Sequence, residues 1–425
     1  MRLRLIVLPA AAAALLAFAA GCRETPRVRA RPLTDVTFER TDARRERGRY
    51  LAEGVLQCFA CHSDRDVSKP GAPPAEGRTG AGHVWRDDGT YRLVAPNLTP
   101  DRETGAGTWT DDMFARAIRE GVGHDGRPLH PQMWFMAFRY LSDEDVASVV
   151  VYLRSIPAVR NPLPQTRLKA EEVAEVTRNL WPLAGAVPPP DLSTPVARGR
   201  YLARIADCSG CHTAWEAPLN PGRYGGGNLI ETMATGAPLK AFSRNLTQDA
   251  SGIPYYDDAL FIEAMRTGKV RGRALSPLMP WVVFGRMSDG DLRAIAAYLA
   301  TVPRVPHFVD AAEAVGLCTL CGQEHGGGAL NRPKESPRVP VDAAATEGCE
   351  GTYRFSDGYT LVFVREGATL FAVAGGARDE LFTEDNRRFF SKRDAFLAEF
   401  VRGPDGRVTH FLDRAFDDDR AERVK

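Results

Sequence analysis

Two segments with helical spacing of apolar residues recur along the chain, at 142–157 and 288–303. In both, apolar positions return every three or four residues, which is the period of an amphipathic helix. Ser142 and Ser288 stand where an N-cap is expected, an aspartate follows three residues later, and a proline ends each segment. Each segment is therefore predicted to form a helix.

These helices close a longer internal repeat. Residues 126–157 align without a gap on residues 272–303, at a constant offset of 146. Further upstream, the stretch ERGRYLAEGVLQCFACHS at 46–63 returns as ARGRYLARIADCSGCHT at 197–213. The loops between these motifs are rich in glycine, proline and asparagine, so something other than a large apolar core must organise them. The chain is predicted to contain a duplicated, mostly helical domain.

The C-terminal part follows a different pattern. From about Gly351 onward, short segments alternate between apolar and polar residues, as strands with one buried face do. Pairs typical of tight turns separate them, namely Asp357-Gly358, Glu366-Gly367 and Asp405-Gly406. This pattern predicts an antiparallel sheet with hairpin turns.

The first residues have the pattern of an export signal. Two arginines precede an apolar run at 5–20, which is short for a membrane-spanning helix. The sequence AAGC at 19–22 resembles a bacterial lipoprotein box, so we expect a lipid anchor on Cys22. The mature chain is then expected on the periplasmic side of a bacterial membrane, held by its lipid. Ordinary signal cleavage, which would give a soluble periplasmic protein, is the alternative.

Composition and charge bear on which class of partner the chain is expected to bind. The 425-residue chain has 44% hydrophobic residues and a formal net charge of +1. These values permit more than one apolar core and give no general reason to expect nucleic acid. The arginine-rich stretch that follows Cys22 is interpreted as a tether near a lipid surface.

Two cysteine motifs carry the candidate chemistry. Each is a CxxCH sequence, formed by Cys58, Cys61 and His62 and by Cys208, Cys211 and His212. Zinc would need four ligands where each motif supplies three, and a dithiol redox site should open a helix among strands that are missing here. Two thiols at this spacing can instead bond to the two vinyl groups of one haem, with the histidine as proximal ligand. We therefore predict two covalently bound haem c groups.

Each iron also needs a ligand on its other side. The candidates are Met113, Met133, Met136, His83, His124 and His130 in the first copy and Met233, Met265, Met279 and Met287 in the second. The offset of 146 maps Met133 onto Met279, whereas it maps Met136 and His130 onto residues that do not ligate iron. Met133 and Met279 are therefore the predicted ligands, although a methionine can also be a core residue. Met136 and His130 remain fallback ligands for the first haem.

Both copies resemble class I c-type cytochrome domains, and the pair is similar to dihaem cytochromes related to the electron-transfer subunits of periplasmic alcohol and aldehyde dehydrogenases. The resemblance covers roughly 41–304 and rests on the CxxCH motifs, an NLT loop, a Pro-x-Met loop and the final helix. It implies that the first and last helices of each copy cross at a glycine facing a tyrosine. It also places two asparagines near the haem edge. These residues are Gly48 with Tyr152, Gly199 with Tyr298, and Asn97 and Asn245.

The expected fold class is mainly α, with two tandem class I cytochrome c domains followed by a small antiparallel β domain. The expected parts are a signal peptide (1–21), a basic tether (22–40), cytochrome c domain 1 (41–158), a linker (159–194), cytochrome c domain 2 (195–304), a Cys-containing linker (305–345), a small β domain (346–415) and a charged tail (416–425).

A third CxxC motif departs from the family pattern. Cys318 and Cys321 are followed by Gly322, where a haem would need histidine. Together with Cys349 they form an odd set, for which a disulfide is the first interpretation. A zinc site that adds His325 is the second, and a free thiol or an atypical haem is the third.

Irons with His and Met ligands offer no open position to a substrate, so the chain is interpreted as an electron carrier rather than an enzyme. It would take electrons from a periplasmic dehydrogenase and pass them to a soluble cytochrome or a terminal oxidase. The alternative is a dihaem enzyme of the peroxidase or thiosulfate-oxidising type with one labile ligand. A sensor or docking module, in which the β tail binds a partner, is a third possibility.

Overall fold

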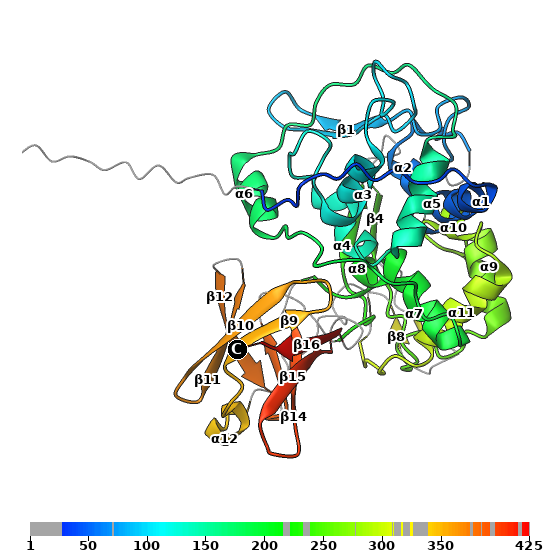
Figure 1. Ribbon diagram of the computed structural model, residues 1–425. Coiled ribbons are helices and arrows are strands. Elements are labelled where there is room, and N and C mark those ends of the chain that lie inside the picture. Colours follow the sequence, from blue (N-terminus) through cyan, green and yellow to red (C-terminus); the bar gives the residue numbers. More distant parts are fainter. Residues whose placement is uncertain are drawn as a thin grey trace, which may run out of the picture.

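The computed structural model describes most of the chain (Figure 1). The described residues are 28–69, 72–215, 222–232, 239–276, 278–307, 309, 316–317, 324–325, 339–374, 377–383, 385–391, 396–414 and 419–424. The predicted signal peptide, the predicted lipid anchor Cys22 and the cysteines Cys318 and Cys321 lie outside them. Among the residues described, no helix has both the length and the hydrophobicity that crossing a membrane requires.

The first repeat consists of short helices joined by long loops and one small hairpin. Thr41 caps its first helix, Thr110 a middle helix and Ser142 the last one, each by accepting a hydrogen bond from a backbone N–H one turn on. Its elements are α1 (Asp42–Tyr50), a π-helical turn η1 (Leu51–Val55), α2 (Cys58–Cys61), β1 (His83–Asp87), β2 (Arg92–Ala95), α3 (Asp111–Glu120), a 3₁₀ turn η2 (Pro131–Met133), α4 (Phe135–Phe138) and α5 (Asp143–Leu153).

The second repeat follows the linker helix α6 (Ala170–Arg178) and has the same order of α-helices and the same first hairpin, with a second short ribbon after its third helix. The N-cap predicted at Ser288 is confirmed, because its side chain accepts a hydrogen bond from the backbone of Asp291. The elements are α7 (Pro195–Ile205), α8 (Cys208–His212), β3 (Leu229–Thr232), β4 (Leu239–Phe242), α9 (Asp258–Thr267), β5 (Lys269–Val270), β6 (Arg273–Ala274), α10 (Trp281–Phe284) and α11 (Asp289–Leu299).

A glycine lets the first and last helices of each repeat cross in close contact. A Cβ atom on Gly48 would lie 1.9 Å from the carbonyl oxygen of Ser148 and 2.7 Å from the Cβ of Tyr152, so the predicted crossing is confirmed there. In the second repeat a Cβ on Gly199 would lie 1.8 Å from the carbonyl oxygen of Ala294. That contact is one helical turn before the predicted partner Tyr298, and it is equivalent to the contact with Ser148.

The two repeats contact each other through reciprocal tyrosine–aspartate hydrogen bonds. Tyr201, in α7 of the second repeat, donates to Asp145 at the start of α5 over 2.6 Å. Tyr50, in α1 of the first repeat, donates in the same way to Asp291 at the start of α11. The phenol oxygen of Tyr50 also accepts a hydrogen bond from the backbone N–H of Ser288 over 3.1 Å. The repeats therefore face each other with approximate two-fold symmetry.

The C-terminal part forms a closed antiparallel barrel of eight strands, in the order β10-β11-β12-β13-β14-β15-β16-β9. Large aromatic side chains fill its interior, and Tyr353, Phe363, Phe389 and Phe411 are almost fully buried. The strands are β9 (Gly351–Phe355), β10 (Thr360–Glu366), β11 (Thr369–Ala374), β12 (Ala377–Thr383), β13 (Arg388–Ser391), β14 (Leu397–Arg402), β15 (Val408–Asp413) and β16 (Asp419–Arg423), preceded by the short helix α12 (Ala343–Thr346). A two-stranded ribbon, β7 (Gly316–Leu317) with β8 (Glu324–His325), lies between α11 and α12 in sequence.

The predicted fold class is wrong, because the chain is not mainly α with two tandem class I cytochrome c domains. The barrel is a complete eight-stranded unit, and further two-stranded sheets lie between the helices of the repeats. The closing strand β16 lies within 416–425, for which the sequence suggested only a charged tail. Backbone pairing between β16 and β9 closes the barrel, and the short, charged sequence of β16 did not indicate it.

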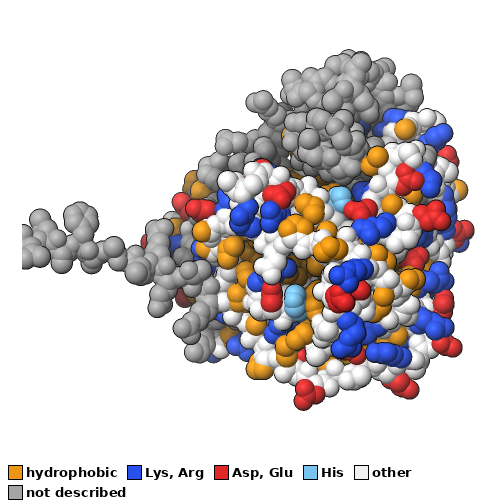
Figure 2. Space-filling view, turned by 90° about the horizontal axis from the view of Figure 1, so that it is seen from above, with side chains coloured by type: hydrophobic (Ala, Val, Ile, Leu, Met, Phe, Trp, Pro, Cys, Tyr) orange, Lys and Arg blue, Asp and Glu red, His pale blue; other side chains and the backbone are white. Residues whose placement is uncertain are grey.

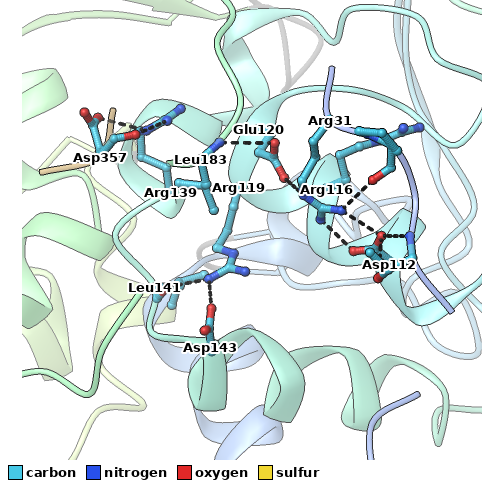
Figure 3. Close-up of polar contacts among 12 residues, drawn as sticks. Arg31, Asp112, Arg116, Arg119, Glu120, Arg139, Leu141, Asp143, Leu183 and Asp357 are labelled. Atoms are coloured by element: carbon cyan, nitrogen blue, oxygen red, sulfur yellow. Dashed lines mark hydrogen bonds and ion pairs between the residues drawn. The ribbon is translucent and has the colours of Figure 1, made fainter. Parts of the chain in front are cut away.

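The basic segment before α1 lies along α3. Arg31 forms ion pairs with Asp112 (2.6 Å) and Glu120 (2.8 Å), both of which are buried (Figure 3). The backbone N–H groups of Thr34 and Phe38 donate to the carboxylates at the start of α3, Asp112 and Asp111. Acidic residues at a helix N-terminus are favourable for the helix dipole, and here they also bind the preceding chain.

The surface seen from above shows charged and apolar side chains interspersed (Figure 2). Arginine and lysine side chains alternate with acidic ones across this face, in agreement with a formal net charge of +1 for the whole chain.

We expect Gly48→Ala to destabilise the folded protein strongly, because the added methyl group would overlap the backbone of α5. The free energy of unfolding should fall by about 3 kcal/mol or more. Urea denaturation of the purified full-length protein measures this loss. The matched control is Gly290→Ala in α11, where the nearest atom outside the helix lies 3.8 Å away. A loss equal to that of the control would show that the helices are not in contact at Gly48.

Candidate functional site

Each CxxCH motif lies on one short helical turn. Gln57 and Asp207 precede the first cysteines in left-handed conformation, with φ angles of 58° and 55°. This backbone conformation turns the chain sharply from the preceding helix into α2 or α8. Because the two cysteines of each motif are three residues apart on a helix, their thiols lie on the same face, one turn apart.

Both motif histidines are held by a backbone carbonyl group. The Nδ1 atom of His62 lies 2.8 Å from the carbonyl oxygen of Pro96, and that of His212 lies 2.7 Å from the carbonyl oxygen of Arg244. A carbonyl oxygen can only accept, so Nδ1 carries the proton and Nε2 keeps its lone pair. Burial also lowers the pKa of both histidines, which favours the neutral form. Both rings are therefore prepared to bind a metal through Nε2.

The two NLT loops position these carbonyl groups. The side-chain oxygen of Asn97 accepts from the N–H and the hydroxyl of Thr99, and its Nδ2 donates to the carbonyl of Val159 over 2.8 Å. Asn245 makes the same contacts with Thr247 and Val305 in the second repeat. The asparagines thus connect the residue that holds each histidine to the chain segment after the last helix. Sequence reasoning placed them near the haem edge, and the structure gives them this supporting role.

The thiols are unsuited to dithiol chemistry. Burial raises the pKa of Cys58 to about 12, that of Cys61 to about 11 and that of Cys211 to about 12. A redox-active CxxC pair needs a lowered thiol pKa, because the thiolate is the nucleophile. Within the described part of the chain, no three His, Cys, Asp or Glu side chains come together as a metal site would require.

The two methionines singled out by the repeat occupy equivalent positions. The N–H of Met133, at the end of η2, donates to the carbonyl of His130 over 2.9 Å. The N–H of Met279 donates to the carbonyl of Ser276, the counterpart of His130, over 3.0 Å. Both side chains are half-buried and pack against the core shared by the two repeats.

Several rival ligands in the first repeat have other contacts. His83 lies 3.0 Å from Asp64, His124 stacks on Trp109 with ring centroids 4.4 Å apart, and His130 accepts from the N–H of Gln132. The thioether of Met113 accepts from the N–H of Thr110, and Met136 is 43% exposed. In the second repeat Met265 and Met287 are buried in the core, and Met233 lies outside the described residues.

Taken together, each repeat offers what a covalently bound haem requires. Two thiols stand one turn apart, an imidazole is oriented by a carbonyl group, and a half-buried methionine makes the equivalent backbone hydrogen bond in both copies. The residues present therefore fit haem c.

The third cysteine group stays a prediction. Cys349 is fully buried, its Sγ lies 3.5 Å from the carbonyl oxygen of Ala345, and it forms no disulfide with another described cysteine. Cys318 and Cys321 lie outside the described residues, and only the backbone of His325 is described. Neither the predicted disulfide nor the predicted zinc site is tested.

Sequence reasoning missed the groups that orient the site. The carbonyl groups of Pro96 and Arg244 leave no side-chain signal, although both stand directly before the repeated NLT sequence. Tyr50 and Tyr201 end the repeated GRY motif, and this repetition could have indicated a shared role.

Comparison with known proteins finds relatives among dehydrogenase subunits, while no family model matches the chain. It is 28% identical over 294 residues to the fructose dehydrogenase cytochrome subunit of Gluconobacter japonicus (66% of this chain, 55% of that protein). It is 30% identical over 281 residues to the cytochrome c subunit of alcohol dehydrogenase (quinone) of Gluconobacter oxydans (61% and 55%). It is 30% identical over 279 residues to the gluconate 2-dehydrogenase cytochrome c subunit of Pantoea cypripedii (61% and 60%).

The chain is thus a homologue of cytochrome c subunits of dehydrogenases, at modest identity. It spans little more than half the length of each of these three relatives. More than a third of the chain lies outside the matches to the alcohol and gluconate dehydrogenase subunits.

We expect Asn97→Ala to loosen the first histidine, because it removes the hydrogen bonds that hold the Pro96 segment. The free energy of unfolding should fall by about 2–3 kcal/mol, at about 1 kcal/mol for each hydrogen bond lost. Chemical denaturation measures this change. The control is Asn179→Ala at the exposed end of α6, which should stay within about 0.5 kcal/mol of the parent. Equal losses in the two variants would contradict the supporting role of Asn97.

Asp207 gives the second site a titratable neighbour where the first site has Gln57. Burial raises the pKa of Asp207 to about 7 from its ordinary value of 3.8. The protonated form is thus favoured in the fold. Asp207 therefore lowers stability progressively as pH rises from about 4 to about 7, and the penalty is constant above that range.

We expect Asp207→Asn to remove this penalty. The variant should match the parent below about pH 4 and exceed its free energy of unfolding by about 2 kcal/mol or more at about pH 8. Denaturation curves measured across this range test the sign. Gln57→Glu is the converse variant and should lose stability at about pH 8. A difference between Asp207→Asn and the parent that does not change with pH would contradict the assignment.

Proposed function

We propose that the chain is an electron carrier with two covalently bound haem c groups, one in each repeat. The observation that carries the proposal is the equivalent environment of His62 and His212. His62 is buried and His212 is half-buried. Each Nδ1 faces a carbonyl oxygen, each histidine has a pKa lowered in favour of the neutral form, and each follows two thiols one turn apart. The homology to cytochrome c subunits supports the same function.

The residues of each repeat have distinct roles in this proposal. The cysteines would hold the haem through thioether bonds, and His62 or His212 would bind the iron through Nε2. Met133 or Met279 would be the second protein ligand and would exclude water. Haem c bound in this way supplies an iron that changes oxidation state with little rearrangement. The contact between the repeats then keeps the two sites at a constant separation, because Tyr50 and Tyr201 each link one repeat to the last helix of the other.

The same arrangement disfavours a dihaem enzyme. A peroxidase-type site needs a position on one iron that substrate can reach. The equivalent backbone contacts of Met133 and Met279 support the same ligation on both irons. In the first repeat, His130 and Met113 already have hydrogen-bond partners.

We place the carrier on the periplasmic side of a bacterial membrane, between a dehydrogenase and a respiratory acceptor. The basic, apolar and small residues at 1–22 support export and a lipid on Cys22. A soluble cytochrome or a terminal oxidase is the acceptor class. The names of the relatives support a dehydrogenase as electron donor.

We expect two haems per chain and no change in the reduced spectrum when carbon monoxide is added. Carbon monoxide binds only where the sixth position is open or labile. Met133→Leu should open the first site and Met279→Leu the second, so that each variant binds about one equivalent of the gas. Haem quantification and carbon monoxide difference spectra measure both quantities.

Met136→Leu is the matched control, because Met136 lies three residues from Met133 and is 43% exposed. It should leave the spectrum unchanged. Rapid carbon monoxide binding by the unmodified protein would contradict the carrier and favour an enzyme with one open site.

A further inference from the structure

The barrel docks on the segment that follows Met133. Arg139, directly after α4, forms an ion pair with Asp357 in the β9–β10 turn, with 3.0 Å between Nε and Oδ2 (Figure 3). The side chains are 1% and 10% exposed, so this pair is almost completely removed from water. A buried pair of this kind is costly to break, because the remaining partner would be an uncompensated buried charge.

Aromatic side chains extend the contact on both sides of Arg139. The guanidinium group of Arg139 lies over the ring of Trp181 at 4.4 Å, and Trp181 packs on Tyr359 with ring centroids 4.4 Å apart. Next to this, Tyr140 donates to Asp419 of β16 over 3.3 Å, and Asp419 also pairs with Arg204 of the second repeat. The barrel thus holds the end of α4, the linker and α7 together.

This contact reaches the candidate ligand through a small apolar cluster. Met133 packs against the cluster formed by Val122, Phe135, Val176 and Leu180. Phe135 begins α4, which ends one residue before Arg139, and Leu180 directly precedes Trp181. Met133 packs on this cluster, and the barrel contacts Arg139 and Trp181, which adjoin the cluster in sequence. Trp134, between Met133 and α4, has a positive φ of 54°, a conformation that a non-glycine residue keeps only when its surroundings impose it.

The second repeat has a different arrangement at the equivalent place. The offset of 146 maps Arg139 onto Gly285, which has no side chain to form an ion pair, and Tyr140 onto Arg286. Arg286 instead pairs with Glu53 of the first repeat over 3.2 Å, beside a cleft of about 210 Å³. Both repeats also have a matching hydrogen bond to the chain that follows the methionine segment, and in each repeat the donor belongs to the same repeat. Arg119 donates to the carbonyl of Leu141, and Arg266 donates to the carbonyl of Met287.

We propose that Asp357 is a positioning residue for the first haem site: by pairing with Arg139 it holds the Met133 segment in its ligating conformation, without acting on Met279. The proposal rests on the proposed function, in which Met133 is an iron ligand. The partner of Arg139 is thus supplied by a domain that follows both repeats in sequence. The barrel gives one of two otherwise similar sites a firmer axial ligand.

The test uses the full-length protein with both haems bound and the variant Asp357→Asn, which keeps the size of the side chain and removes its charge. Amide hydrogen exchange over 131–141 should become about tenfold faster or more, while exchange over 278–287 stays unchanged. About half of the charge-transfer absorbance of Met-ligated ferric haem should disappear at a lower pH than in the parent protein. The midpoint potential of one haem should also be lower than in the parent protein.

Three further variants make the test specific. Asp405→Asn, in the β14–β15 turn, makes the same chemical change elsewhere on the barrel and should have no effect on either segment. Asp357→Glu keeps the charge and should restore most of the parent behaviour. Tyr359→Leu removes the packing on Trp181 while Asp357 remains, and it should accelerate exchange over 131–141 even if Asp357→Asn does not fold.

Unchanged exchange and absorbance in both Asp357→Asn and Tyr359→Leu would overturn the proposal, and so would equal acceleration of both segments. Failure of the proposed function has a different signature. If Met133→Leu left the charge-transfer absorbance intact, Met133 would not be the ligand. Exchange over 131–141 would still report whether Asp357 holds the segment.

Discussion

The close crossing of the first and last helices in each repeat positions both the CxxCH turn and the contact between the repeats. Gly48 and Gly199 bring two backbones into contact because neither carries a side chain. Two residues after each glycine stands the tyrosine that reaches the other repeat, and the CxxCH turn follows within the same stretch. One close contact therefore fixes both the position of the CxxCH turn and the surface through which the two copies meet.

That surface combines the internal packing of each repeat with the contact between them. Asp145 pairs with Arg47 of its own repeat at 2.8 Å and accepts a hydrogen bond from Tyr201 of the other. Asp291 has the same two partners, Arg198 and Tyr50. Each aspartate also lies in the first turn of a helix, where a negative charge is favourable. Loosening either repeat would therefore also loosen the interface, which favours a fixed relation between the two sites.

The sequence was informative where one residue type has one dominant use. The serine caps of the last helices and the glycine at the first crossing were both visible in it. The fold class was wrong because the length and closure of a sheet depend on backbone pairing between distant strands, such as β16 with β9, which no local pattern encodes. The carbonyl groups that hold His62 and His212 were invisible for a related reason. A backbone acceptor has the same chemistry in every residue, so only the fold can select it.

The two sites share their CxxCH motif and the repeated methionine, so a difference between them must come from their surroundings. Beside the second CxxCH turn stands Asp207, a half-buried carboxyl group, where the first turn has the neutral Gln57. Beside the first methionine segment stands the barrel, where the second has Gly285. If both sites hold haem as proposed, the Arg139–Asp357 pair acts on the first site alone and the side chain of Asp207 on the second alone. Duplication supplied two similar motifs, and the residues that differ between the copies are where the two sites can come to differ.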